Sequence, residues 1–229
     1  MAALPPSADI VIIGAGAIGT AIAYHLARKG AWDVLVLERD MVGAGPSSKA
    51  AGGIRVEFRL KIEVEFSLRG IEFFKRFRDE MGAECDFRQE GYLFLLTTEA
   101  DVARFRKNQA VQLALGADSR MISAQEAREL VPSMRVDDVL AAVWGPHDGY
   151  ASPNDVVQAY AAQARARGVT IAEETAVTGI ELEQGRVTAV QTSAGRVATR
   201  LCINAAGPWA APIGEMAGLR IPVDPRRRH

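Results

Sequence analysis

The pattern of hydrophobic positions changes along the chain. Near its beginning, Ile10–Ile13 and Val34–Leu37 are unbroken apolar runs rich in β-branched side chains, which is typical of parallel strands buried on both faces. Between these runs, apolar residues from Ile18 to Leu26 recur at helical spacing, and the segment stops at Gly30. The chain therefore begins with a predicted strand–helix–strand unit.

Several strands predicted later alternate between apolar and polar residues instead. Strands are predicted over residues 92–97, 139–144, 169–172, 176–182, 186–192 and 197–203, and helices over 62–77, 100–115, 123–132 and 153–168. The dipeptide Gln184-Gly185 predicts a hairpin turn, so the strands around it indicate a small antiparallel element. The aromatic residues of the helix over 62–77, such as Phe66 and Phe77, are expected in the core.

Three glycines follow the first strand with the spacing GxGxxG, at Gly14, Gly16 and Gly19. In a dinucleotide-binding turn, the first permits the tight turn, the second lets the backbone approach a pyrophosphate, and the third lets the helix pack closely. The phosphates would lie at the helix N-terminus, where free N–H groups favour anions. Glu38 closes the second strand, where its carboxylate can bind ribose hydroxyls and would repel the 2′-phosphate of NADP. NAD and FAD both fit this pattern.

Composition narrows the classes of function. The chain has 229 residues, 48% of them hydrophobic, which is enough for one large domain or two smaller ones. A net charge of −1 does not indicate a surface that binds nucleic acid. The short basic run 226–228 is expected to be a solvated end of the chain. Two cysteines, Cys85 and Cys202, are too few for a disulfide framework or a thiolate metal site, so no metal is expected. Neither a secretory leader nor a run of transmembrane length is apparent, so a cytoplasmic location without membrane contact is expected.

Two further stretches are rich in small residues. Residues 41–55 follow the strand–helix–strand unit and would let backbone lie directly against a ligand, although a flexible loop has the same composition. Residues 204–211 end a predicted strand before a helix, as the first corner does. No general acid–base pair is apparent, so the catalytic residues stay unknown. His25 is expected to be a structural or exposed residue, and His147 is a candidate for a site. His229 is uninformative, and Asp148 and Tyr150 are expected to fix a turn.

These segments together carry a family resemblance. The sequence resembles the FAD-dependent amine and amino-acid oxidoreductases of the D-amino-acid oxidase and sarcosine oxidase type, nearest the sarcosine oxidase β-subunit and dimethylglycine dehydrogenase-like branch. The matching segments, in the family's order, are DIVIIGAGAIGTAIAYHLARKG, VLVLERD, the stretch from Ser47-Ser48 to Gly52-Gly53-Ile54-Arg55, SLRGIEFFKRF, EGYL, DGYASPNDV and INAAGPWA.

The resemblance implies an α/β fold in which a Rossmann-like, FAD-binding parallel sheet with helices is interleaved with an incomplete antiparallel-sheet substrate domain. The implied boundaries are 1–82 and 151–217 for the FAD-binding domain, 83–150 for the substrate domain, and 218–229 for the start of a truncated substrate-domain segment. The cofactor-binding residues implied by position are Gly14, Ala15, Gly16, Ala17, Ile18, Gly19, Glu38, Arg39, Ser47, Ser48, Ala51, Gly52, Gly53, Arg55, Val177, Ala205, Ala206, Gly207 and Trp209. Arg55 could touch flavin, a substrate carboxylate or only protein.

The reaction implied by the resemblance is oxidation of the C–N bond of a small secondary or tertiary amino acid, such as sarcosine or dimethylglycine, with hydride transfer to flavin. Family members continue beyond the point that matches 221–228, so we expect a truncated form, with a second subunit or chain completing the substrate domain. The alternative is a catalytically inactive FAD-binding fragment or a partner subunit of a split oxidoreductase. A third reading, an NAD-dependent dehydrogenase, has no support from the residues after Glu38.

Overall fold

A computed structural model describes residues 4–226, so the end of the basic run and His229 lie outside the described residues. The chain forms two compact units. The first unit contains the residues up to Ala50 and from Pro153 onward, and the second contains 51–152. Residues 51–82, which the sequence assigned to the FAD-binding domain, therefore belong to the second unit.

A parallel sheet forms the centre of the first unit. Its strands, in spatial order, are β12 (Leu201–Asn204), β1 (Ile10–Ile13), β2 (Val34–Leu37) and β8 (Thr170–Ala172), and all neighbours are parallel. Ile10 pairs with Val34 on one side and with Leu201 on the other, so the carboxyl ends of β1, β2 and β12 meet at one edge. The sequence predicted the parallel pairing of β1 and β2 correctly, because both are continuous apolar runs.

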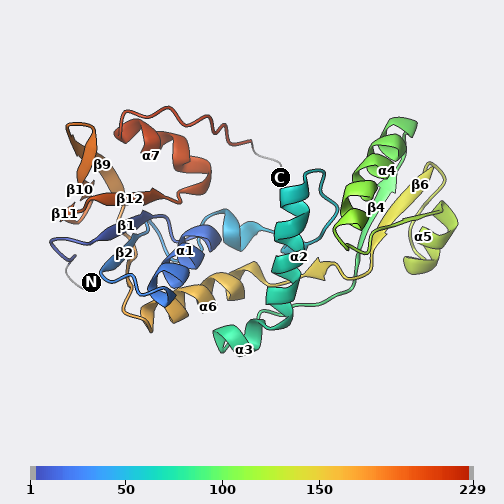
Figure 1. Cartoon of the computed structure of the whole chain (residues 1–229), viewed down its shortest axis with the longest axis horizontal. Helices are drawn as coiled ribbons and strands as arrows, with labels where there is room; N and C mark the ends of the chain where they lie inside the picture. The colour runs from blue at the N-terminus through green and yellow to red at the C-terminus, as the bar shows by residue number, and fades with distance from the viewer. Residues whose placement is uncertain (1–3, 227–229) are drawn as a thin grey trace. The chain divides into compact units, whose positions relative to one another are not determined.

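Each face of this sheet is covered by different elements (Figure 1). On one face, α1 (Ala17–Arg28) packs with α6 (Pro153–Arg165). The other face is covered by α7 (Ala210–Met216) and by the antiparallel sheet of β9 (Val177–Glu183), β10 (Arg186–Thr192) and β11 (Gly195–Ala198). Val11, Ile13, Leu35 and Leu37 point toward that second layer, because alternate residues of a strand face the same side.

The second unit is built on a separate antiparallel sheet. Its strands, in spatial order, are β4 (Tyr92–Leu96), β6 (Ala141–Gly145) and β5 (Arg120–Ile122), and a two-stranded pair joins β3 (Gly53–Ile54) to β7 (Gly149–Tyr150). Its helices are α2 (Lys61–Lys75), α3 (Phe77–Met81), α4 (Glu99–Ala114) and α5 (Ala124–Leu130). α5 begins with the predicted capping box of Ser123 and Glu126. Strand β5 was not predicted from the sequence.

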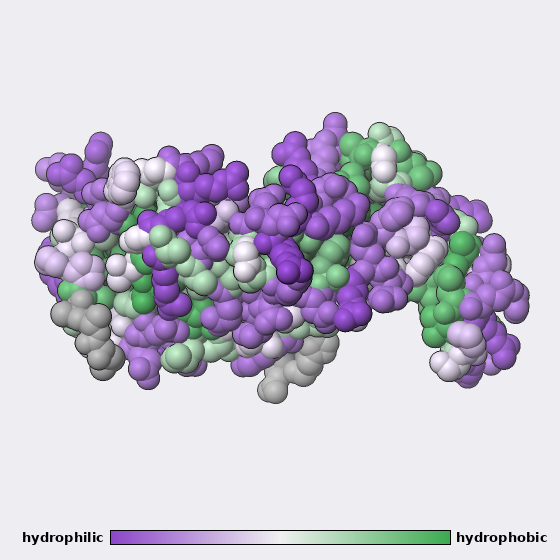
Figure 2. Space-filling view, turned by 90° about the horizontal axis from the view of Figure 1, so that it is seen from below, coloured by the Kyte–Doolittle hydropathy of each residue, from purple (hydrophilic) through white to green (hydrophobic). Residues whose placement is uncertain are grey.

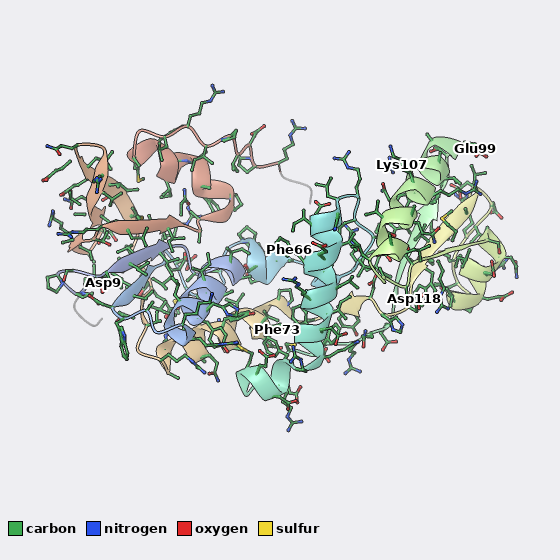
Figure 3. The ribbon with its side chains drawn as sticks, viewed as in Figure 1. Asp9, Phe66, Phe73, Glu99, Lys107 and Asp118 are labelled. Carbon is green, nitrogen blue, oxygen red and sulfur yellow. The ribbon has the colours of Figure 1, made fainter. Side chains whose placement is uncertain are left out.

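The helix expected over 62–77 differs from the prediction in two ways. It breaks at Arg76, which separates α2 from α3. α2 buries Val64 and Ile71 against Val56 and Ala117, so residues off that stripe are not in the core. Phe66, seen with Phe73 on α2 in Figure 3, is 64% exposed, so the expectation of a core position is wrong for this residue. The same expectation is confirmed for Phe77, which is 2% exposed.

The surface gives limited information about function. Polar residues cover most of the face in Figure 2, and apolar surface gathers in patches toward the right of the view. Leu95 and Leu140 are exposed apolar side chains of the second unit. Within residues 4–226, no helix has both the length and the apolar character needed to cross a bilayer. Over the same residues, no group of three or more His, Cys, Asp or Glu side chains is placed to hold a metal ion.

The packing of α1 leads to a stability prediction. A Cβ added to Gly19 would overlap the carbonyl oxygen of Gly14, whereas a Cβ added to Gly70, in α2, would meet open space. Gly19→Ala should therefore lower the free energy of unfolding by about 1–3 kcal/mol or more, as overpacked cores do. Gly70→Ala is the matched control and should raise it by about 0.5–1 kcal/mol, because alanine favours helix.

Urea unfolding of both variants tests this difference. Equal effects of the two substitutions would show that α1 does not depend on close approach at Gly19.

Candidate functional site

A cavity of about 470 Å³ lies within the first unit, at the carboxyl ends of β1, β2 and β12. In open parallel sheets this edge is where ligands bind, and the volume is within the usual range for ligand pockets. The predicted site residues that line it are Gly14, Gly16, Ala17, Ile18, Glu38, Arg39, Ser47, Val177, Ala205, Ala206, Gly207 and Trp209. The structure thus brings the three separate sequence stretches together around one space.

The first corner of the cavity requires glycine. Gly14 has a φ of +105°, which side chains disfavour, and its N–H donates to the carbonyl oxygen of Leu37 at 2.8 Å. A Cβ at this position would lie 2.5 Å from the carbonyl oxygen of Ala205. Gly19 is buried where α1 meets this turn, which confirms that it permits close packing. Both glycines therefore let the strand, the helix and β12 approach each other.

The N-terminus of α1 points its backbone N–H groups at the cavity. Gly16 is the N-cap residue, and Ala17 N–H donates to Ser47 Oγ at 3.0 Å. Because the first N–H groups of a helix lack partners within the helix, this end suits a phosphate. Ile18, which the sequence placed on the apolar face of the helix, is 68% exposed and lines the cavity instead. The buried face contains Thr20, Ala23 and Tyr24.

A fixed carboxylate closes the second strand. Glu38 Oε2 accepts a hydrogen bond from Ala15 N–H at 2.8 Å, and Oε1 accepts one from Asp40 N–H at 3.0 Å. These two bonds hold the carboxylate at the wall of the cavity, where its remaining lone pairs can accept hydroxyl donors. The guanidinium carbon of Arg39, the next residue, lies 3.8 Å from the ring centroid of Trp209, so a cation–π contact joins two walls of the cavity.

The third wall comes from the end of β12. Ala205 N–H donates to the carbonyl oxygen of Ile13 at 2.9 Å, which extends the β1–β12 pairing to the turn. The side chain of Asn204 then holds the turn at both ends. Its Oδ1 accepts from Ala206 N–H at 3.2 Å, and its Nδ2 donates to the carbonyl oxygen of Ala210 at 2.8 Å. The small residues after Asn204 are thus fixed with backbone exposed to the cavity.

Other predicted residues do not line this cavity. Ala15 and Gly19 are buried behind it, and Ser48 donates to the carbonyl oxygen of Gly45. Ala51, Gly52, Gly53 and Arg55 belong to the second unit. Five further lining residues fall within the two small-residue stretches 41–55 and 204–211: Ala44, Gly45, Pro46, Lys49 and Pro208. The lining residues that the sequence missed are Ile13, Leu37, Asp40, Thr175, Ala176, Pro212, Ile213 and Met216. Several of these directly flank a predicted position, and sequence proximity is the signal that could have found them.

Arg55 occupies a distinctive environment in the second unit. Its guanidinium carbon lies 4.4, 5.1 and 5.8 Å from the ring centroids of Phe58, Phe94 and Tyr92. One N–H donates to the carbonyl oxygen of Glu57 at 3.4 Å. The Arg55 side chain is half-buried, and a guanidinium held by aromatic faces presents a planar set of donors that suits a carboxylate.

The histidines have structural surroundings. The ring of His25 lies 4.9 Å from that of Tyr24, in agreement with the structural role expected. His147 Nε2 lies 3.3 Å from Asp118 Oδ2, and its side chain is 66% exposed. Hydrogen bonding to Arg120 is the main cause that lowers the pKa of Asp118, and His147 adds to it. His147 is therefore an exposed neighbour of Asp118 on the surface of the second unit.

Comparison with known proteins identifies the family. The profile described as "FAD dependent oxidoreductase" matches residues 9–229, which is nearly the whole chain. The chain belongs to this family of FAD-dependent oxidoreductases. The resemblance drawn from the sequence motifs is thereby confirmed, as is the expectation of FAD rather than another dinucleotide.

Three mitochondrial proteins are similar to nearly the whole of this chain but are much longer than it. Sarcosine dehydrogenase of Mus musculus is 31% identical over 96% of this chain, and dimethylglycine dehydrogenase of Rattus norvegicus is 32% identical over 95%. The pyruvate dehydrogenase phosphatase regulatory subunit of Mus musculus is 30% identical over 93%. The chain spans 25%, 25% and 24% of these three proteins, respectively.

A solved structure has the same fold. L-proline dehydrogenase from P. horikoshii superposes with a TM-score of 0.89 and 35% sequence identity, over 96% of this chain and 58% of that one. The α/β fold with a parallel sheet and separate antiparallel sheets, predicted from the sequence, is confirmed.

The cavity fits the adenosine diphosphate part of FAD. Gly14, Gly16 and Ala17 line the cavity where α1 begins, and Ser47 Oγ accepts a hydrogen bond from Ala17 N–H beside them. Glu38 supplies a fixed acceptor for ribose hydroxyls. Backbone N–H groups and one carboxylate are the donor and acceptor set that a pyrophosphate and a ribose require.

Removal of this carboxylate should weaken FAD binding. Glu38→Ala should raise the Kd for FAD about tenfold to a hundredfold, because a hydrogen bond to a charged group contributes about 1.5–3 kcal/mol. Quenching of Trp209 fluorescence during an FAD titration measures this affinity, since Trp209 lines the cavity. Trp209→Phe should remove most of the signal and so verifies the probe.

Glu183→Ala is the matched control, because it removes an exposed carboxylate at the end of β9. An unchanged Kd in Glu38→Ala would place the ribose elsewhere.

Proposed function

We propose that this chain forms the FAD-binding part of an oxidoreductase that oxidises the C–N bond of a small secondary or tertiary amino acid. The observation that carries the proposal is the cavity at the carboxyl ends of β1, β2 and β12, with the α1 N-terminus and the fixed Glu38 carboxylate on its walls. Support for the substrate class comes from the sarcosine and dimethylglycine dehydrogenase relatives and from the proline dehydrogenase structure.

The residues of the first unit serve to bind and orient the cofactor. When bound, FAD supplies the two-electron acceptor for the reaction. Backbone N–H groups at the start of α1 hold the pyrophosphate, and Glu38 holds the adenosine ribose. The turn after Asn204 presents exposed backbone from the opposite wall. These groups position the cofactor and leave the electron transfer to it.

Arg55 is our candidate for the substrate carboxylate. Its guanidinium is held by the rings of Phe58, Phe94 and Tyr92, and among the described residues it makes one long hydrogen bond, to Glu57. A planar fork of donors fixed in this way can bind a carboxylate through two parallel bonds. Such a contact would orient the amino acid through its carboxylate and leave the C–N bond free to react. A second subunit or chain that completes the substrate site is part of this proposal.

Reduction of the bound flavin tests the reaction. In the absence of oxygen, addition of sarcosine, dimethylglycine or proline to the FAD-loaded protein should bleach the yellow absorption as hydride reaches the cofactor. N-methylated amines without a carboxylate are the matched control and should bleach it slowly, because they lack the group that Arg55 binds. Absorption spectroscopy measures both rates.

A second candidate function is an FAD-binding subunit without turnover. The specific observation in its favour is the 30% identity to a protein described as a regulatory subunit. Yellow protein that no amino acid bleaches would support this candidate. Protein that stays colourless after addition of FAD would contradict both candidates.

Substitution of Arg55 separates its two possible ligands. Arg55→Met should slow bleaching at low amino-acid concentration by at least about tenfold, the loss expected for a charge-assisted bond, and should leave the Kd for FAD unchanged. Arg59→Met, which removes an exposed arginine four residues away, is the control. A raised Kd for FAD with unchanged bleaching would assign Arg55 to the cofactor instead.

A further inference from the structure

Two carboxyl groups are buried together in the second unit. Glu57 is 5% exposed and Asp148 is 1% exposed. They come from opposite sides of one junction, because β3 pairs with β7 and places the segment after Ile54 beside the turn before Gly149. Both side chains converge on Gly145, where an added Cβ would overlap Asp148 Oδ2 and Glu57 Oε1. The two oxygens are therefore neighbours.

The four carboxyl oxygens are all buried, and none of them accepts a hydrogen bond of standard geometry from the described residues. An ionised carboxylate without partners in the interior is costly, and two side by side are more so. A carboxylic acid can donate to a carboxylate, so a single proton between the groups satisfies one oxygen of each. The other groups that act on Asp148 are the Val56 N–H and the Arg55 guanidinium.

We propose that Glu57 and Asp148 share one proton and that this acid–carboxylate pair fastens the segment carrying Arg55 to the turn between β6 and β7. Because all four oxygens are shielded from solvent, the pair does not touch substrate and acts as a positioning pair. The segment it holds has Arg55 two residues before Glu57, and Gln112 Nε2 donates to Phe58 O at 2.9 Å just beyond it. The shared proton does not depend on the proposed function. Only the role of the pair in positioning Arg55 for a substrate carboxylate rests on it.

Burial is the largest cause that raises the pKa of Asp148 from 3.8 to about 9, followed by the hydrogen bond and the charge of Glu57. Val56 N–H and Arg55 oppose this shift. A raised pKa in the folded state means that the folded chain binds a proton that the unfolded chain has lost. The stability from this proton is complete below about pH 4 and declines as the pH rises to about 9.

Asp148→Asn tests the shared proton. Asparagine stays neutral and can donate to Glu57 at every pH, so the variant should lack the decline that the wild type shows. Between about pH 4 and pH 9, the ratio of the wild-type to the variant unfolding constant should rise by up to about tenfold per pH unit, the limit for one proton. Urea unfolding of the full chain without FAD measures this ratio, so the result does not depend on cofactor binding or turnover.

Two further variants complete the design. Glu57→Gln should weaken the same pH dependence without removing it, because burial still raises the pKa of Asp148, and it serves if Asp148→Asn does not fold. Asp118→Asn is the matched control: it removes a partly exposed carboxyl of the same unit, labelled in Figure 3, whose pKa is lowered by Arg120. Its pH dependence should have the opposite sign, with stability lost relative to wild type as the pH rises above the range in which Asp118 ionises.

A spectroscopic readout distinguishes the pair from general packing. Trp144 precedes Gly145 in β6, and with Trp32 and Trp209 replaced by Phe its fluorescence reports on this junction. The folded protein should show a transition with a midpoint near pH 9 that disappears in Asp148→Asn. Parallel stability profiles for wild type and Asp148→Asn, or the same Trp144 transition in both, would overturn the shared proton.

Discussion

The close approach of the Gly14 turn to the end of β12 is the constraint on which the first unit depends. The carbonyl oxygen of Ala205 occupies the space where a side chain on residue 14 would lie, and the carbonyl oxygen of Gly14 in turn occupies the space next to Gly19. Strand, helix and third wall can meet only because these positions lack a Cβ. The cavity, the direction of the α1 N-terminus and the position of Glu38 all follow from this contact.

Local features of the site could be predicted from the sequence, because their causes are local. The apolar runs of β1 and β2, the glycine spacing and the acid at position 38 each report on a few neighbouring residues. Helical spacing alone places Ile18 on the apolar face of the helix, whereas the family resemblance placed it among the cofactor-binding residues, and it lines the cavity. The same limit applies to Phe66. The apolar stripe on α2 is wide, and its sequence does not tell which of its residues pack against the core.

Features that depend on contacts between distant segments could not be predicted from the sequence. Asp148 looked like a turn residue, because nothing local indicates that Glu57 will be buried beside it. Residues 51–82 appeared to continue the FAD-binding domain because they follow its motifs, yet Val64 and Ile71 pack against Val56 and Ala117 of the second unit. Thr175 and Ala176 line the cavity through the path of the chain after β8, without any motif of their own.

The pairing of β1 with β12 also sets an order of events during synthesis. Ile10 and Leu201 lie side by side in the sheet as register partners, although nearly the whole chain separates them. A ribosome releases the glycine turn long before it releases the strand that completes the cavity. A nascent chain therefore displays the nucleotide motif without the wall after Asn204, and stable cofactor capture waits until this late, non-local pairing has formed.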